Sequence, residues 1–156
     1  MNAQMNNPSQ PKTVLFDIDG TLADIERRRG HLDKPSPDWK AFNAAMGDDT
    51  PNEPVVSLYL TLWSSPEYSP ILVTSRSETS RKITEQWLIW NEIPFSRMLM
   101  RKAKDFRADH IIKEEILDQL LAEGLTTHFT VDDRQQMVDM WRRRGITCLQ
   151  CDVGDF

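Results

Sequence analysis

Two pairs of acidic residues in this sequence are of a type and spacing that could act on a phosphate group. Asp17 and Asp19 lie two positions apart in the segment DIDGT, and Asp132 and Asp133 are adjacent in VDD. Carboxylates brought close together repel one another unless a cation neutralises them, and oxygen ligands of this kind suit Mg²⁺. A carboxylate can also attack phosphorus to form an aspartyl-phosphate, while a second acid transfers the protons. The two pairs therefore predict a magnesium-dependent phosphoryl-transfer site.

A second set of residues offers hydroxyl and cationic groups that can hold the oxygens of a phosphate group. Thr74 and Ser75 carry hydroxyls, and Arg76 carries a guanidinium fork that can bind two oxygens at once. Lys113 offers a point charge, and Asp109 precedes it by four positions, so both would share one face of a helix's first turn. The sequence has no His or Cys cluster of the kind that binds zinc. These residues favour magnesium and an anionic substrate.

Short apolar segments precede these polar groups and predict the strands that position them. The predicted strands cover residues 13–17, 69–74, 97–101, 127–133 and 146–151. The predicted helices cover residues 36–47, 52–65, 78–92, 109–123 and 135–144. This alternation predicts an α/β fold with a doubly wound, parallel five-stranded sheet that has helices on both faces. Because ligands bind at the carboxyl ends of such strands, we expect the polar groups to meet in one site.

The length of 156 residues and the net charge of −5 limit the domain organisation and the partners. Residues 1–11 are polar and predict a flexible tail, whereas residues 12–156 predict one domain. An insert over about residues 25–68 predicts a small helical cap, since it is too short for a large closing domain. The acidic charge argues against wholesale non-specific binding to nucleic acid. No apolar run approaches the roughly 20 residues that cross a bilayer, and no secretory signal is evident, so we expect a cytoplasmic protein without a membrane partner.

The order of these motifs resembles that of the haloacid dehalogenase (HAD) superfamily of phosphohydrolases. DIDGT followed by LAD, then Thr74, Lys113 and VDD match its four motifs in order. The stretches DIDGTLAD, TSRS, MRKAKDFRADHIIKEEIL and VDDRQQMVDMWRRRGITCLQC further resemble the 3′-phosphatase domain of bacteriophage polynucleotide kinase-phosphatase, over residues 12–156. The resemblance implies a HAD-like, Rossmann-type fold, Mg²⁺ as cofactor and a phosphatase activity.

The resemblance also implies roles for the acidic residues. Asp17 would be the nucleophile and would touch Mg²⁺, and Asp19 would be the general acid and base with its backbone carbonyl on the metal. Asp132 and Asp133 would anchor the metal, the second more directly.

Further roles follow for residues that would contact the phosphate or support the site. Thr74 and Lys113 would hold the phosphate, and Arg76 and Asp109 match an arginine and an acid that the phage enzymes need. A needed arginine about eleven residues after the nucleophile corresponds to Arg28. The chain departs from the phage enzyme in lacking the P-loop signature of its kinase domain, in having TSR where serine-glycine-arginine is usual, and in its insert.

Three functions remain open from the sequence. The first is a 3′-phosphatase on DNA or RNA ends, the second a phosphatase of free nucleotides, and the third a non-enzymatic receiver-like phospho-acceptor. Basic clusters at residues 27–29, 97–107 and 142–144 could contact a nucleic acid or be solvated helix ends. Trp39 could stack on a base, but its helical spacing with Phe42 and Met46 favours packing. A phage-encoded protein would act in the host cytoplasm, and the oligomeric state stays open.

Overall fold

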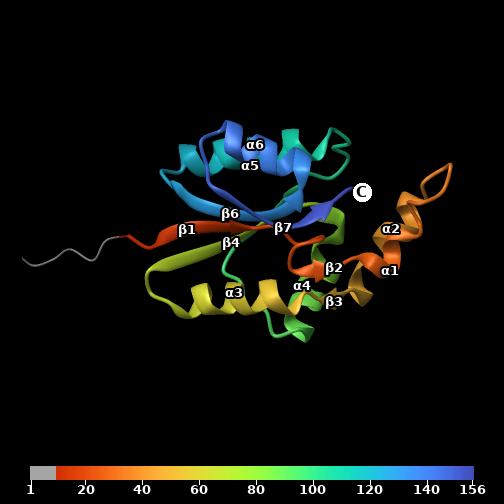
Figure 1. Ribbon diagram of the computed structural model, residues 1–156, viewed down its shortest axis with the longest axis horizontal. Helices are drawn as coiled ribbons and strands as arrows, with labels where there is room; N and C mark the ends of the chain where they lie inside the picture. Colours follow the sequence, from red (N-terminus) through yellow and green to blue (C-terminus); the bar gives the residue numbers. More distant parts are fainter. Residues whose placement is uncertain (1–9) are drawn as a thin grey trace, which may run out of the picture.

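A parallel five-stranded sheet forms the centre of the protein. The computed structural model describes residues 10–156, so residues 1–9 of the predicted tail lie outside the described part. The strands run in the order β5-β4-β1-β6-β7 and all pair in parallel (Figure 1). They are β1 (Lys12–Phe16), β4 (Tyr68–Ser77), β5 (Met98–Arg101), β6 (Thr127–Arg134) and β7 (Cys148–Gly154). The predicted α/β fold with five parallel strands is confirmed.

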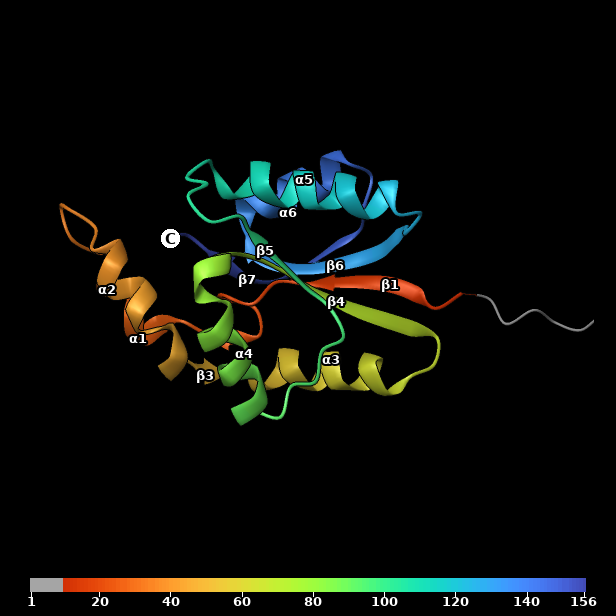
Figure 2. The same ribbon diagram turned by 180° about the vertical axis from the view of Figure 1, so that it is seen from behind.

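Two helices cover each face of the sheet (Figures 1 and 2). One face carries α3 and α4 and the other α5 and α6, with bounds Glu53–Ser64, Arg81–Trp90, Asp109–Ala122 and Gln135–Arg143, respectively. Successive side chains of a strand point to opposite faces, so Phe16 of β1 packs with Tyr59 and Trp87 while Leu15 packs with Leu117 and Trp141. This double covering explains why the strands read as continuous apolar runs.

The path of the chain brings the ends of three strands together. From the central β1 the chain passes to β4 and β5 on one side, then returns to β6 and β7 on the other. Strand order therefore reverses at β1, and the carboxyl ends of β1, β4 and β6 meet at the reversal point, where ligands bind in open parallel sheets.

The insert after β1 forms small elements that the sequence predicted only in part. The ribbon of β2 (Ala23–Asp24) and β3 (Thr50–Pro51), the helix α1 (Glu26–Arg29) and the 3-10 turn η1 (Met46–Asp48) were not predicted. The helix α2 (Trp39–Ala44) is shorter than the predicted 36–47, because Asp38 caps it by accepting a hydrogen bond from the backbone N–H of Ala41.

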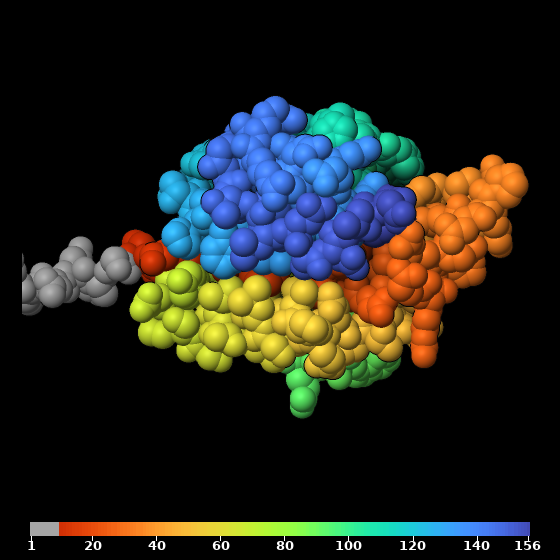
Figure 3. All heavy atoms as spheres, in the orientation of Figure 1, coloured from red at the N-terminus to blue at the C-terminus, as the bar shows by residue number. Residues whose placement is uncertain are grey.

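The helices α1 and α2 stand beside the sheet (Figure 1), and in Figure 3 the orange atoms of this segment project from the body of the molecule. The predicted insert of residues 25–68 also contains α3, but α3 lies against the sheet, where Tyr59 meets Phe16 edge-to-face at 5.1 Å. The part of the insert that stands near the site is therefore shorter than the predicted range of residues 25–68, and it ends before β3. No helix within residues 10–156 is long and apolar enough to cross a bilayer.

Candidate active site

Asp17 follows directly on β1 and pairs with a buried lysine. Its backbone N–H donates to the carbonyl of Val131 at 3.1 Å, which fixes the residue against β6. Lys113 of α5 places its Nζ 2.8 Å from Oδ1 of Asp17 and 2.7 Å from Oδ2 of Asp132. Burial raises the pKa of Asp17 well above its ordinary value, and Lys113 opposes this shift while Asp132 reinforces it. The ammonium group thus ties the ends of two strands to one helix.

Three buried carboxylates form a cluster that fits a divalent cation. Asp17, Asp132 and Asp133 each offer an oxygen within 4.8 Å of the other two. When all three groups are ionised, Lys113 neutralises one charge, and two carboxylates are then left without a cationic partner in the protein interior. Burial, reinforced by Asp132, raises the pKa of Asp133 to about 7. An oxygen-only ligand set with this charge deficit suits Mg²⁺.

The two acids of the second pair have different environments. Oδ2 of Asp132 accepts hydrogen bonds from Lys113 and from Nε1 of Trp141 at 3.1 Å, whereas Asp133 accepts only a 3.3 Å bond from the hydroxyl of Thr21 among the side chains of the described residues. Asp132 therefore orients Lys113, and Asp133 has the more available oxygens.

Gly20 allows Asp133 to reach the cluster. The residue has a φ of +78°, and a Cβ atom there would lie 2.1 Å from Oδ2 of Asp133. Only glycine leaves room for the carboxylate of Asp133 beneath the turn of DIDGT, so this turn and the metal cluster are built together.

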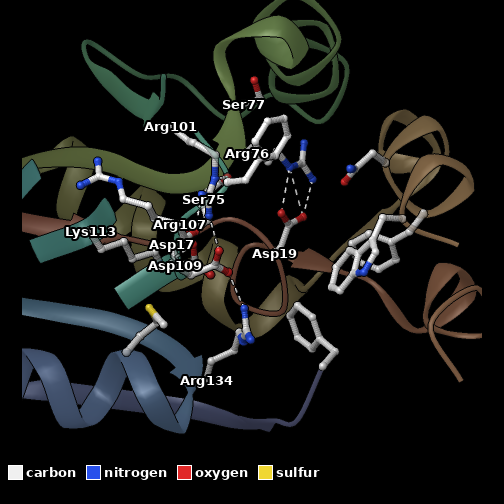
Figure 4. A pocket seen from close by; sticks show the side chains of 16 residues that line it. Asp17, Asp19, Ser75, Arg76, Ser77, Arg101, Arg107, Asp109, Lys113 and Arg134 are labelled. Carbon is white, nitrogen blue, oxygen red and sulfur yellow. Dashed lines mark hydrogen bonds and ion pairs between the residues drawn. The ribbon is translucent and has the colours of Figure 1, made fainter. Parts of the chain in front are cut away.

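Asp19 points away from the cluster toward two arginines. Nε and Nη2 of Arg76 donate to the Asp19 carboxylate, the shortest of these bonds being 2.6 Å (Figure 4). Nη2 of Arg28 donates to the same carboxylate. Burial opposes ionisation of Asp19, but the charges of Arg76 and Arg28 hold its pKa well below the ordinary range. Asp19 is therefore a carboxylate at neutral pH in this arrangement.

Asp49 is a buried part of this network that the sequence analysis missed. Its carboxylate accepts hydrogen bonds from Nε of Arg28 at 2.8 Å, from Nη2 of Arg28 at 2.7 Å and from Nη2 of Arg76 at 3.3 Å. Its backbone carbonyl accepts a 2.7 Å bond from the indole of Trp87. Asp49 follows η1 in a polar stretch, MGDDT, in which nothing local distinguishes it from Asp48.

The carboxyl end of β4 supplies hydroxyl groups at two depths. Thr74 is fully buried, and its Oγ1 accepts a 3.1 Å bond from the backbone N–H of Arg76, so it shapes the turn. Ser75 lines the pocket, and its hydroxyl has no hydrogen-bond partner within residues 10–156. Ser75 thus carries the unpaired hydroxyl of this turn among the described residues.

Asp109 stands at the first turn of α5 between two arginines that the sequence analysis had not assigned to the site. It accepts hydrogen bonds from Arg101 and Arg134, and Figure 4 shows Arg134 reaching toward it. Asp109 and Lys113 both line the pocket, as their helical spacing requires.

A cavity of about 490 Å³ opens over Asp17 and unites most of the predicted set. The predicted residues that line it are Asp17, Asp19, Ser75, Arg76, Asp109 and Lys113. Arg28 lies deeper, with a side chain only 1% exposed, and contacts Asp19 and Asp49. The cavity therefore brings the acids Asp17, Asp19 and Asp109 together with the cations Arg76 and Lys113.

Trp39 packs as its helical spacing predicted but keeps an exposed face, and the basic cluster at residues 142–144 agrees with its interpretation as a solvated helix end. Trp39 packs edge-to-face on Phe42 at 5.7 Å, yet it remains 53% exposed and lines the cavity. Arg143 and Arg144 pair with acids on α5, as expected for solvated helix ends.

Comparison with known proteins agrees with this geometry. The family model of the polynucleotide kinase PNKP phosphatase domain matches residues 11–156. A chain of a Pnkp1/Rnl/Hen1 complex is 34% identical, with a TM-score of 0.79, over 96% of this chain and 49% of that chain. A chain of the Pnkp1/Rnl/Hen1 RNA repair complex is 33% identical, with a TM-score of 0.78, over 96% of this chain and 45% of that chain. The protein thus spans about half the length of these relatives.

More distant structures share the fold. A HAD family enzyme from Bacteroides thetaiotaomicron, solved as a magnesium complex, is 17% identical with a TM-score of 0.55, over 94% of this chain and 96% of that chain. The family match covers nearly all of the described residues, and it removes the non-enzymatic receiver from consideration. The chain therefore belongs to the PNKP phosphatase domain family of HAD-like hydrolases, and it is a phosphatase.

Proposed function

We propose that the protein is a magnesium-dependent polynucleotide 3′-phosphatase that works through phosphorylated Asp17. The observation that carries the proposal is the cavity itself. Asp17 and Lys113 lie at its base, while Arg107, Arg134 and Trp39 line it farther out. A cationic and aromatic wall of this kind suits a substrate that continues beyond its phosphate, as a nucleic-acid end does.

Asp17 would act first. The oxygen of Asp17 that does not face Lys113 attacks phosphorus, and the bond from phosphorus to the 3′ oxygen breaks. Asp19, which takes up a proton from solvent once the phosphate has drawn Arg76 away from it, gives that proton to the 3′ oxygen. In the second half of the reaction Asp19 takes a proton from water, and that water attacks phosphorylated Asp17. Inorganic phosphate leaves and the Asp17 carboxylate is regenerated.

The neighbouring residues would hold the phosphate and prepare Asp19. Ser75 and Arg76 lie where they can donate to phosphate oxygens, and the phosphate would compete with Asp19 for the guanidinium group of Arg76. This competition would release the carboxyl group of Asp19 for proton transfer. Lys113 keeps Asp17 in place throughout.

Mg²⁺ would be held by Asp17, by Asp133 with Asp132 beside it, and by the backbone carbonyl of Asp19. When bound there, the ion would neutralise the charge of the phosphate oxygens during transfer. The uncompensated charge of the carboxylate cluster supports this assignment.

Hydrolysis of free nucleotides is the second candidate function. The pairing of Arg143 and Arg144 with Glu114 and Asp118, together with the net charge of −5, reduces the basic surface that a long strand could follow. A cytoplasmic location, in the host in the case of a phage-encoded protein, belongs to the same proposal.

Phosphate release from a panel of substrates tests the proposal. The panel contains DNA and RNA oligonucleotides with a 3′-phosphate, the same strands with a 5′-phosphate, and nucleoside 3′- and 5′-monophosphates, each with Mg²⁺ and with EDTA. We expect rapid release from 3′-phosphorylated strands in Mg²⁺ alone, and none from the Asp17→Asn protein. Rapid release from monophosphates without release from any oligonucleotide would establish the second candidate instead.

A further inference from the structure

Phe106 presents an apolar ring to solvent at the mouth of the active-site cavity. Phe106 is 92% exposed, which is the highest value among the large hydrophobic residues within residues 10–156. It lines the same cavity as Asp17. Phenylalanine normally contributes by burial, so a ring in this position gives little to the stability of the fold. The ring is, however, placed where a bound substrate would cover it.

The loop that carries Phe106 is fixed from both sides. Nη1 of Arg101 donates to the backbone carbonyls of Asp105 at 3.0 Å and Arg107 at 2.6 Å, and its Nε donates to the carbonyl of Ser75 at 2.9 Å. The loop is therefore tied directly to the phosphate-binding end of β4. Arg101, which the sequence had offered as a nucleic-acid contact, therefore holds this loop in place.

On the outer side, Arg107 braces the same loop. Its guanidinium group donates to Asp105 at 2.7 Å and to Glu115 of α5 at 2.6 Å. Contacts on both flanks of Phe106 hold the backbone that carries the ring in one place, so a ligand that stacks on the ring has to order only this side chain.

Trp39 offers a second ring at the same cavity. It is the first residue of α2, and Asp38 caps that helix. The indole of Trp39 packs edge-to-face on the ring of Phe42. The guanidinium carbon of Arg28 lies 4.3 Å from the centre of the Phe42 ring. About half of the Trp39 side chain remains exposed at the cavity. The two rings come from the insert and from the β5–α5 loop, which are far apart in the sequence.

We propose that Trp39 and Phe106 bind the nucleobases next to the 3′-phosphate by stacking. We call these two residues the aromatic rim. The inference rests on the proposed function and deepens it: the cavity that holds Asp17 continues to both rings, where the bases next to a phosphate bound at Asp17 would lie. Since every base has a stacking face, the rim favours polynucleotide ends over small phosphate esters without favouring one base.

Kinetics with matched substrates test the aromatic rim. One 3′-phosphorylated oligodeoxynucleotide carries normal bases, and a second lacks the bases of its last two nucleotides but keeps every phosphate. For Trp39→Ala and Phe106→Ala we expect the KM for the normal strand to rise about tenfold, with kcat little changed, and the KM for the abasic strand to stay as in the wild type. Trp39→Tyr should restore most of the affinity, whereas Phe106→Leu, which is apolar but not aromatic, should not.

Trp90→Ala is the matched control, because Trp90 is 71% exposed on α4 and lies outside the cavity lining among the described residues. Circular dichroism and thermal melting of each variant exclude unfolding as the cause of a change. Equal KM values for the wild type and both alanine variants on the normal strand would overturn the aromatic rim and leave the 3′-phosphatase proposal intact. A wild-type protein that releases phosphate from no 3′-phosphorylated strand would overturn both.

Discussion

Replacement of Asp49 tests whether a buried acid remote from the reacting atoms controls the site. Asp49→Ala removes the carboxylate that accepts three short bonds from Arg28 and a longer one from Arg76. Both arginines are at least nine-tenths buried and would share Asp19 as their remaining acid. Breaking a buried ion pair by removing one partner costs about 3–5 kcal/mol, so we expect the melting temperature to fall by about 10 °C.

The activity of the Asp49 variant should fall by more than its stability explains. Without Asp49, Arg76 and Arg28 lose the anchor that sets their distance from Asp19, and a displacement of about 1 Å in a positioned group can lower a rate about a hundredfold. We expect kcat on a 3′-phosphorylated oligonucleotide to fall about 10- to 100-fold at 20 °C, where the variant is folded. Asp49→Asn, which keeps the shape but not the charge, should give a smaller loss.

Asp48 provides the control, because it is the adjacent acid, is exposed, and has no ion pair among the described residues. Asp48→Ala should therefore match the wild type in melting temperature and in kcat. If Asp49→Ala has the wild-type kcat and KM, Asp49 does not position the arginines. If its melting temperature lies within about 2 °C of the wild type, the cost assigned to the broken pair is wrong.

Three further outcomes are expected at the carboxylate cluster. Mg²⁺ should raise the melting temperature of the wild type by mass action but should not raise that of Asp133→Asn. In EDTA, Asp133→Asn should melt above the wild type because one repelling charge is gone, and equal melting temperatures would contradict this charge argument. Gly20→Ala should lose about 2 kcal/mol or more of unfolding free energy in urea titrations and nearly all phosphatase activity, because its Cβ would lie 2.1 Å from Asp133. An active variant would contradict the claim that only glycine fits this turn. Lys113→Met should abolish phosphate release and lower the stability, because Asp17 and Asp132 would face each other without their shared cation; activity above one per cent of wild type would show that Asp17 does not need Lys113.

Local sequence patterns were sufficient for the sheet and its helices. The apolar run before Asp17 and the run before Thr74 each end at a polar turn, and their side chains alternate between two buried faces as such runs require. The same patterns could not find β2 and β3, because two-residue strands carry no periodicity and form only when the insert folds back on itself. The start of α2 was displaced because Ser36 and Asp38 are both good caps and only the folded chain selects between them.

Local patterns were less informative about the support of the site. The DIDGT segment and the Asp109–Lys113 spacing identified four residues that line the cavity, and the VDD segment identified two acids of the carboxylate cluster. The sequence did not distinguish Asp49 from Asp48, and it did not show that Arg101 and Arg107 brace a loop while Phe106 stays exposed. These roles depend on partners in other elements.

The sequence by itself determined the chemistry of this protein: an acid after a buried strand, a second acid two residues later, and donors at the ends of other strands. Such features depend on neighbours within one element, which strand and helix periodicity fix. Tertiary structure alone decided that Arg28 lies behind Asp19, that Asp49 joins it across 21 residues, and that Trp39 keeps a free face at the cavity. Ion pairing and exposure depend on distances in space, and those distances were set when the insert after Asp17 docked beside the sheet.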